Sequence, residues 1–64
     1  MHLTRTHVEE LRGKSPEGVY QLIRQFVREE CGAVDREELE EALQDAVAAD
    51  LLDKRELEKL ENEW

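Results

Sequence analysis

The chain has 64 residues, of which 41% are charged and 39% hydrophobic, and its formal net charge is −8 at pH 7. This length allows one domain at most, residues 1–64, and the hydrophobic share is too high for a fully disordered tail. No segment approaches the roughly 18–20 apolar residues of a membrane span, and the first residues lack the apolar run of a secretory signal. The single cysteine, Cys31, excludes an internal disulfide and favours a reducing compartment, so we expect a small cytoplasmic domain.

The first predicted helix spans roughly residues 6–12. Thr6 and Glu9 have the spacing of a capping box, in which a hydroxyl accepts from a first-turn N–H and a glutamate reaches back to the cap. Gly13 suits the left-handed conformation that commonly follows a short helix.

The second predicted helix spans residues 16–31. Ser15 serves as the N-cap, Pro16 takes the first helical position, where its missing N–H costs nothing, and Gly32 ends the helix. Apolar residues recur at steps of three and four, as expected for one stripe that faces a core. These residues are Val19, Leu22, Ile23, Phe26 and Val27. Tyr20 lies one step from this stripe and is expected at its edge.

The third predicted helix spans residues 36–50. Asp35 and Glu38 form a second capping box, and Val34 and Leu39 are placed to pack together as a hydrophobic staple across the helix start. The apolar spacing of the second helix recurs here, at Leu39, Ala42, Leu43, Ala46 and Val47.

The fourth predicted helix spans residues 54–62 and begins with the same device. Asp53 and Glu56 form the box, and Leu52 and Leu57 form the staple. No stretch alternates as a strand does, and the one proline stands at a helix start. The sequence therefore predicts an all-α fold, a small bundle of four short helices joined by short capped loops.

The net charge is confined to one half of the chain. Residues 1–32 hold five basic and five acidic residues, whereas residues 33–64 hold four basic and twelve acidic ones, which accounts for the whole −8. Within the third helix, Glu37, Glu41 and Asp45 follow each other at intervals of four, so three carboxylates run along one side. Such a row is either a docking surface for a basic partner or a solvated face that only confers solubility.

A metal site is weakly indicated. The segment 32–38 resembles the exit half of an EF-hand loop, with Gly32 at the sharp turn, Val34 at the apolar position and Glu38 as the closing carboxylate. In the entry half only Glu29 supplies a carboxylate, and capping with a staple explains the segment without metal. We expect no metal ligands here, and a degenerate EF-hand-like module is retained as a lesser alternative.

The remaining reactive side chains match no known site. His2 and His7 lie five residues apart, which fits no zinc motif, and Cys31 is expected to be a buried free thiol on the apolar side of the second helix. No nucleophile stands with a base and an orienting group, and there is no glycine-rich phosphate loop. We therefore predict no enzyme activity, no catalytic residues and no cofactor.

Nucleic acids and membranes are not expected partners. If the second and third helices formed a helix-turn-helix, the acidic helix would face the phosphates, whereas affinity for nucleic acid depends on lysine and arginine. The same acidity permits mimicry of a phosphate backbone toward a nucleic-acid-binding protein.

The sequence thus favours a small acidic protein-binding module, such as an inhibitor, an antitoxin-like partner or an adaptor, that docks a basic protein surface through its third and fourth helices. Trp64 either covers the end of the bundle or anchors in a partner pocket. The alternative is a structural homodimer whose acidity only solubilises it. The predicted contact residues are Glu37, Glu38, Glu41, Asp45 and Trp64.

Overall fold

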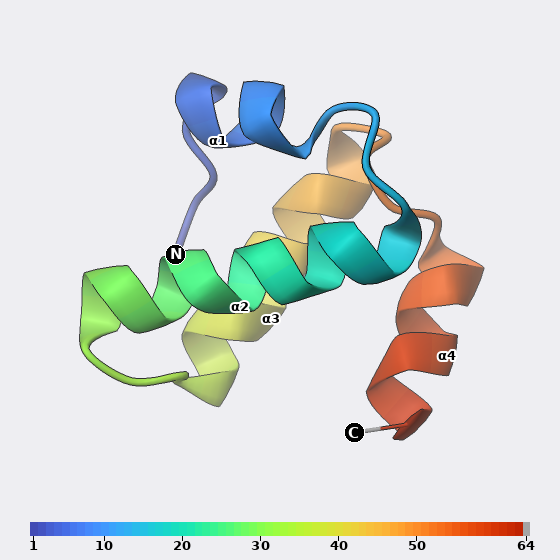
Figure 1. Cartoon of the computed structure of the whole chain (residues 1–64). Coiled ribbons are helices and arrows are strands. Elements are labelled where there is room, and N and C mark those ends of the chain that lie inside the picture. The colour runs from blue at the N-terminus through green and yellow to red at the C-terminus, as the bar shows by residue number, and fades with distance from the viewer. Residues whose placement is uncertain (64) are drawn as a thin grey trace.

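One long helix, α2 (Pro16–Cys31), packs against each of the other three helices of the chain. These are α1 (Arg5–Leu11), α3 (Arg36–Ala48) and α4 (Lys54–Glu63), as Figure 1 shows. The structure, a computed structural model, describes the backbone of residues 1–63 and the side chains of residues 1–62. That part of the chain contains no strand, so the predicted all-α bundle of four helices is confirmed.

The start of α1 differs from the prediction. Thr4, not Thr6, is the N-cap: its hydroxyl accepts from the His7 N–H at 3.3 Å, and the Thr4 N–H donates to Nδ1 of His7 at 3.2 Å. His7 therefore makes the reciprocal hydrogen bond of the capping box, which Glu9 was expected to make. The earlier start lets the His7 ring stack on Phe26 of α2, with ring centres 4.4 Å apart.

The starts of the other helices follow the sequence more closely. Ser15 caps α2 by accepting from the Gly18 N–H, and Asp53 accepts from the Arg55 N–H before α4. Asp35 caps α3 by accepting from the N–H groups of Glu37 and Glu38.

Glycines end α1 and α2, whereas α3 ends without one. Gly13 and Gly32 have φ of 76° and 78°, the left-handed conformation expected of them. Helix α3 stops at Ala48, two residues before the predicted end, because Asp50 turns left-handed with φ of 60°. The Leu51 N–H then donates to the Ala46 carbonyl and the Asp50 N–H to the Val47 carbonyl, which is a Schellman motif.

The core joins all four helices and the first residue of the chain. The predicted apolar stripes supply most of it, and Tyr20, expected at the edge, is buried as well. The buried residues are Met1, Leu11, Val19, Tyr20, Ile23, Phe26, Val27, Leu39, Ala42, Leu43, Ala46, Leu52 and Leu57.

Two residues near the turn between α2 and α3 lie outside this core. Cys31 is exposed, because it is the last residue of α2, so the prediction of a buried thiol is wrong. Val34 is 39% exposed, so only the pair Leu52 and Leu57 shows the burial expected of a staple.

None of the helices in the described residues is both long and apolar enough to cross a membrane.

Candidate functional site

The predicted contact residues of α3 form an acidic ridge, defined here as Glu37, Glu38, Glu41 and Asp45. Because the apolar residues of α3 are buried, the ridge lies on the other side of the helix, toward solvent. The side chains of Glu38, Glu41 and Asp45 are 41%, 44% and 34% exposed. The structure therefore leaves all four carboxylates accessible in part, but it does not leave them all without a partner.

The amino terminus of the chain lies against the ridge. In Figure 1 the N-terminal segment (residues 1–3) runs from α1 to the region where α2 and α3 cross. The α-amino group of Met1 donates to the carboxylate of Glu38 and, at 3.1 Å, to Oε2 of Glu41. The Met1 side chain is buried in the core, which holds the ammonium at this place.

The next two residues extend this contact along α3. The imidazole nitrogens of His2 lie 2.5 Å from Oε1 of Glu41 and 3.0 Å from Oδ2 of Asp45. The Leu3 N–H donates to the same Asp45 oxygen at 3.1 Å. Three ridge carboxylates thus hold the N-terminal segment in place, 37 to 43 residues away in the chain.

This arrangement divides the ridge electrostatically. The hydrogen bond to the Glu38 carboxylate raises the pKa of the Met1 ammonium, which keeps it charged at neutral pH. Glu37 makes no ion pair within the described residues, and no lysine or arginine there pairs with any ridge carboxylate. The ridge therefore keeps a net negative charge, and Glu37 is the ridge carboxylate that has no ion-pair partner within the described residues.

The role of the N-terminal segment in the site was missed by the sequence reasoning. Helical spacing predicts which carboxylates share a side of α3, but contacts between residues so far apart in the chain depend on how α1 packs. A usable signal was present: an ammonium and His2 lie directly before Leu3, an apolar residue that packs against the core.

A cleft of about 270 Å³ lies between α3 and α4, lined by Tyr20, Arg36, Glu40, Leu43 and Glu61. Burial, followed by the hydrogen bond and charge of the neighbouring Glu40 carboxyl, raises the pKa of Glu61. Burial also raises the pKa of Tyr20, against the opposing charge of Arg24. Oε1 of Glu61 is buried and has no hydrogen-bond partner within the described residues. This cleft therefore disfavours the charged form of Glu61 relative to a carboxylate in water.

The residues weighed for metal binding or catalysis have other contacts. His7 serves the cap of α1 and stacks on Phe26, and within the described residues no three His, Cys, Asp or Glu side chains are grouped to hold a metal ion. Desolvation, with the negative charge of Glu38 next, raises the pKa of the Cys31 thiol, which makes it less reactive at neutral pH. Trp64, the remaining predicted contact residue, lies outside the described residues.

Comparison of the chain with protein-family models, with curated proteins and with solved structures finds no match.

Proposed function

We propose that this protein is a small acidic protein-binding module that docks a basic surface of a partner protein through α3 and α4. An inhibitor, an antitoxin-like partner, an adaptor or a mimic of a phosphate backbone would each use such a surface. One observation carries the proposal: the ridge carboxylates remain partly exposed, and no lysine or arginine in the described residues pairs with them.

The binding mechanism would have two stages. The acidic half of the chain attracts a cationic surface over a distance and orients it, which raises the rate of encounter. Close contact then pairs lysine or arginine side chains of the partner with Glu37 and with the partly exposed carboxylate of Glu41. The Met1 ammonium supports this step, because it already lies between two ridge carboxylates and represents the chemistry of a lysine head group.

The test requires a variant that changes the ridge without releasing the N-terminal segment. Reversal of Glu41 or Asp45 would break that contact, whereas Glu37 and the exposed Gln44 hold no side-chain partner in the described residues. We therefore choose E37K/Q44K. The matched control is T6K/E17K, because Glu17 occupies the first turn of α2 as Glu37 occupies that of α3, and both double variants change the net charge by +3.

The immobilised chain and its two variants are exposed to a lysate of the source organism, and the captured proteins are identified by mass spectrometry. Each protein captured by wild type is then purified and titrated at about 0.05 and 0.2 M salt. We expect a basic partner whose affinity falls roughly tenfold or more for E37K/Q44K and by less than threefold for T6K/E17K, since one reversed contact and one added repulsive lysine together cost about 1–2 kcal/mol. Equal affinity of all three chains, or capture of no basic protein, would overturn the proposal.

The homodimer alternative has less support in the structure than it had in the sequence. In that alternative the apolar stripes of the helices continue into a second copy, whereas Val19, Ile23 and Val27 of the α2 stripe are fully buried in the chain's own core.

A further inference from the structure

The N-terminal segment already occupies the ridge in the way that a basic partner would. The Met1 ammonium contacts the carboxylates of Glu38 and Glu41, and the imidazole of His2 lies between Glu41 and Asp45. An ammonium and an imidazole of the chain itself therefore cover three of the four ridge carboxylates before any partner arrives.

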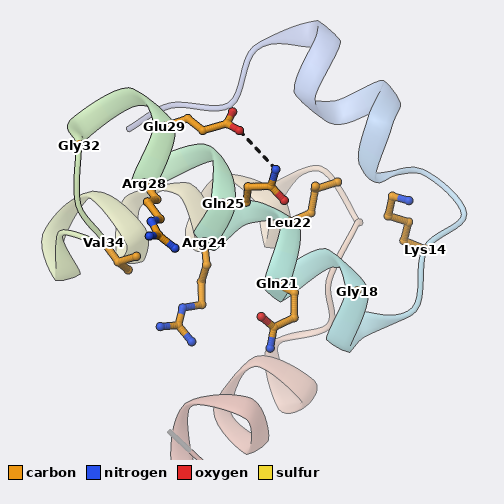
Figure 2. Close-up of a pocket in the computed structure, with 10 residues that line it drawn as sticks. All are labelled: Lys14, Gly18, Gln21, Leu22, Arg24, Gln25, Arg28, Glu29, Gly32 and Val34. Atoms are coloured by element: carbon orange, nitrogen blue, oxygen red, sulfur yellow. Dashed lines mark hydrogen bonds between the residues drawn. The ribbon is translucent and has the colours of Figure 1, made fainter.

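The basic side chains of α2 do not take this place. Lys14 and Arg28 line a groove of about 920 Å³ along α2, and Figure 2 shows them there together with the hydrogen bond from Gln25 to Glu29. None of the residues that line this groove belongs to the ridge, and neither Lys14 nor Arg28 forms an ion pair with a ridge carboxylate. Within the described residues, the N-terminal segment is thus the part of the chain that pairs with the ridge.

The geometry of the His2 ring fits its protonated form. Nε2 lies 2.5 Å from Oε1 of Glu41, and Nδ1 lies 3.0 Å from Oδ2 of Asp45. A neutral imidazole has one N–H and one lone pair, so it donates to one carboxylate and turns its lone pair toward the other. The imidazolium donates from both nitrogens. Loss of the proton therefore removes one of the two hydrogen bonds and both ionic attractions.

His2 is the member of the segment whose charge changes near neutral pH. Its side chain is 77% exposed, and the charged groups that face it are Glu41 and Asp45 of α3 and the neighbouring Met1 ammonium. Within the described residues, α1 and α2 contribute no ion pair to it. The raised pKa of the Met1 ammonium keeps that group charged at neutral pH, whereas imidazole side chains change charge between about pH 5 and 8.

The imidazole contact is linked to the backbone of the segment through Asp45. The Leu3 N–H donates at 3.1 Å to the same Asp45 oxygen that faces Nδ1 of His2, and the Leu3 side chain packs against the core. Release of the ring leaves Asp45 with the Leu3 N–H as its partner and uncovers Oε1 of Glu41. Because Met1 is buried, the segment stays attached to the fold while these oxygens open to solvent.

We propose that the N-terminal segment is an intramolecular competitor for the acidic ridge, and that His2 makes this competition depend on pH. With the imidazole protonated, the segment holds Glu41 and Asp45, and a basic partner meets Glu37 alone. With the imidazole neutral, both carboxylates become available to the partner, so binding is stronger at pH 7.5 than at pH 5.5. The inference rests on the proposed function in one respect, since it treats the ridge as a docking surface, and it adds the regulation of that surface.

Hexalysine is the probe, and its affinity for the full chain is measured by calorimetric titration at pH 5.5 and 7.5 in about 0.05 M salt. We expect the affinity of wild type to be roughly threefold to tenfold lower at pH 5.5, the size of effect that two exposed ion pairs have. H2Q carries no charge at this position and should bind equally at both pH values. H2K carries a charge that does not titrate in this range and should bind weakly at both.

The matched control is H2Q/T6H, which moves the imidazole to an exposed position of α1 and keeps the number of histidines. Its pH dependence measures the effect of net charge alone, and we expect less than a twofold change in affinity. An equal loss for wild type and H2Q/T6H at pH 5.5 overturns the inference, and so does wild-type binding that is absent or independent of pH.

Proton NMR of the His2 ring gives the converse measurement. Because the coupling between two binding events is reciprocal, saturating hexalysine must lower the midpoint of the His2 titration by the logarithm of the same ratio, about 0.5–1 pH unit. The Leu3 amide resonance should follow this titration in wild type and not in H2Q. A midpoint that hexalysine leaves unchanged contradicts the inference. Its failure is separable from that of the proposed function, because E37K/Q44K tests the ridge against the captured partner at a constant pH of 7.5.

Discussion

Asp50 carries the one strained backbone conformation of a non-glycine residue in the described chain. Its φ of 60° ends α3 in the position that glycine usually occupies, and its carboxylate lies near the negative end of the helix dipole. The sequence offers no glycine there, which is why the helix was predicted to continue to this residue. Nothing in the local pattern could reveal that Leu51 turns back to bond the Ala46 carbonyl.

We predict that D50G stabilises the protein. Release of the left-handed strain gains about 1–2 kcal/mol, and the greater freedom of glycine in the unfolded chain returns about 0.5–1 kcal/mol. The net gain of about 0.5–1 kcal/mol corresponds to a melting temperature roughly 2–8 °C higher in thermal denaturation.

The converse substitution provides the control. Gly32 has the same conformation, and a Cβ added there meets nothing within 4 Å, so G32A changes only the backbone preference. We expect G32A to lower the melting temperature by an amount similar to that by which D50G raises it. If both substitutions shifted it in the same direction, strain would not be the cause.

Glu61 leads to a prediction about pH. Because its pKa is raised in the folded protein, the charged form destabilises the fold at neutral pH, and this cost is relieved as pH falls through the folded pKa, above 4.5. E61Q removes the charge, so we expect it to be more stable than wild type at pH 7, by on the order of 1 kcal/mol, because a neutral amide costs less to bury than a carboxylate.

Melting temperatures of wild type and E61Q between pH 4 and pH 7.5 check this sign. The advantage of E61Q should be largest at pH 7 and should vanish toward pH 4. An advantage that does not depend on pH would point to better packing of the amide instead. E58Q, which removes an exposed carboxylate of the same helix, should show little effect.

At the scale of elements, α3 is fixed from two sides. Its apolar side packs on α2, and its ridge holds the N-terminal segment through the Met1 ammonium and His2. The second contact explains why Asp35 caps α3 without the reciprocal bond from Glu38 that a capping box requires. The carboxylate of Glu38 is directed to the ammonium instead.

We predict that the contact between the Met1 ammonium and the ridge stabilises the fold below pH 8 and is lost at higher pH. The folded pKa of this group is raised above 8.0, so its contribution is fully present below the unfolded value and disappears as pH rises through the folded value. The melting temperature should therefore fall between pH 7 and pH 9.5.

Chemical synthesis of the chain with an acetylated Met1 nitrogen isolates this effect. Both chains carry C31S, because the raised pKa of the Cys31 thiol gives a loss of stability in the same pH range. The acetylated chain should melt at a lower temperature at pH 7 and change little up to pH 9.5. Parallel pH profiles of the two chains would show that the ammonium contributes nothing.

The sequence predicted those features of the elements that depend on neighbours in the chain. Ser15, Gly32 and Asp53 act within one turn, so their residue types alone identify the helix ends. The cap at Thr4 was missed because its partner, His7, is chosen by stacking on Phe26, a contact between helices.

The same distinction applies to the candidate site. Helical spacing placed the ridge carboxylates on one side of α3, but the N-terminal segment that pairs with three of them comes from the far end of the chain. The exposure of Val34 was also missed, because the staple pattern predicted that this residue packs against Leu39.

At the scale of the whole molecule, the separation of charge between the two halves persists in the fold. The N-terminal half holds equal numbers of basic and acidic residues, and the C-terminal half supplies the ridge and the whole net charge of −8. Because the radius of gyration is only 10.5 Å, the excess carboxylates of the C-terminal half lie close enough to repel one another. A pair of charges about 10 Å apart in water contributes about 0.4 kcal/mol before screening, so many such pairs outweigh the few ion pairs of the fold.

We therefore predict that NaCl stabilises the protein. Raising the salt from about 0.01 to 0.5 M shortens the Debye length from about 30 Å to below 8 Å, which screens the repulsion between carboxylates more than the close contacts of the N-terminal segment. The melting temperature should rise by roughly 4–8 °C, equivalent to about 1 kcal/mol. It should rise less for E37K/Q44K, whose net negative charge is lower by three units. T6K/E17K has the same net charge and should show the same rise if only net charge matters. A larger loss of salt dependence for E37K/Q44K than for T6K/E17K would instead locate the repulsion on the ridge, which is the surface that a basic partner would neutralise.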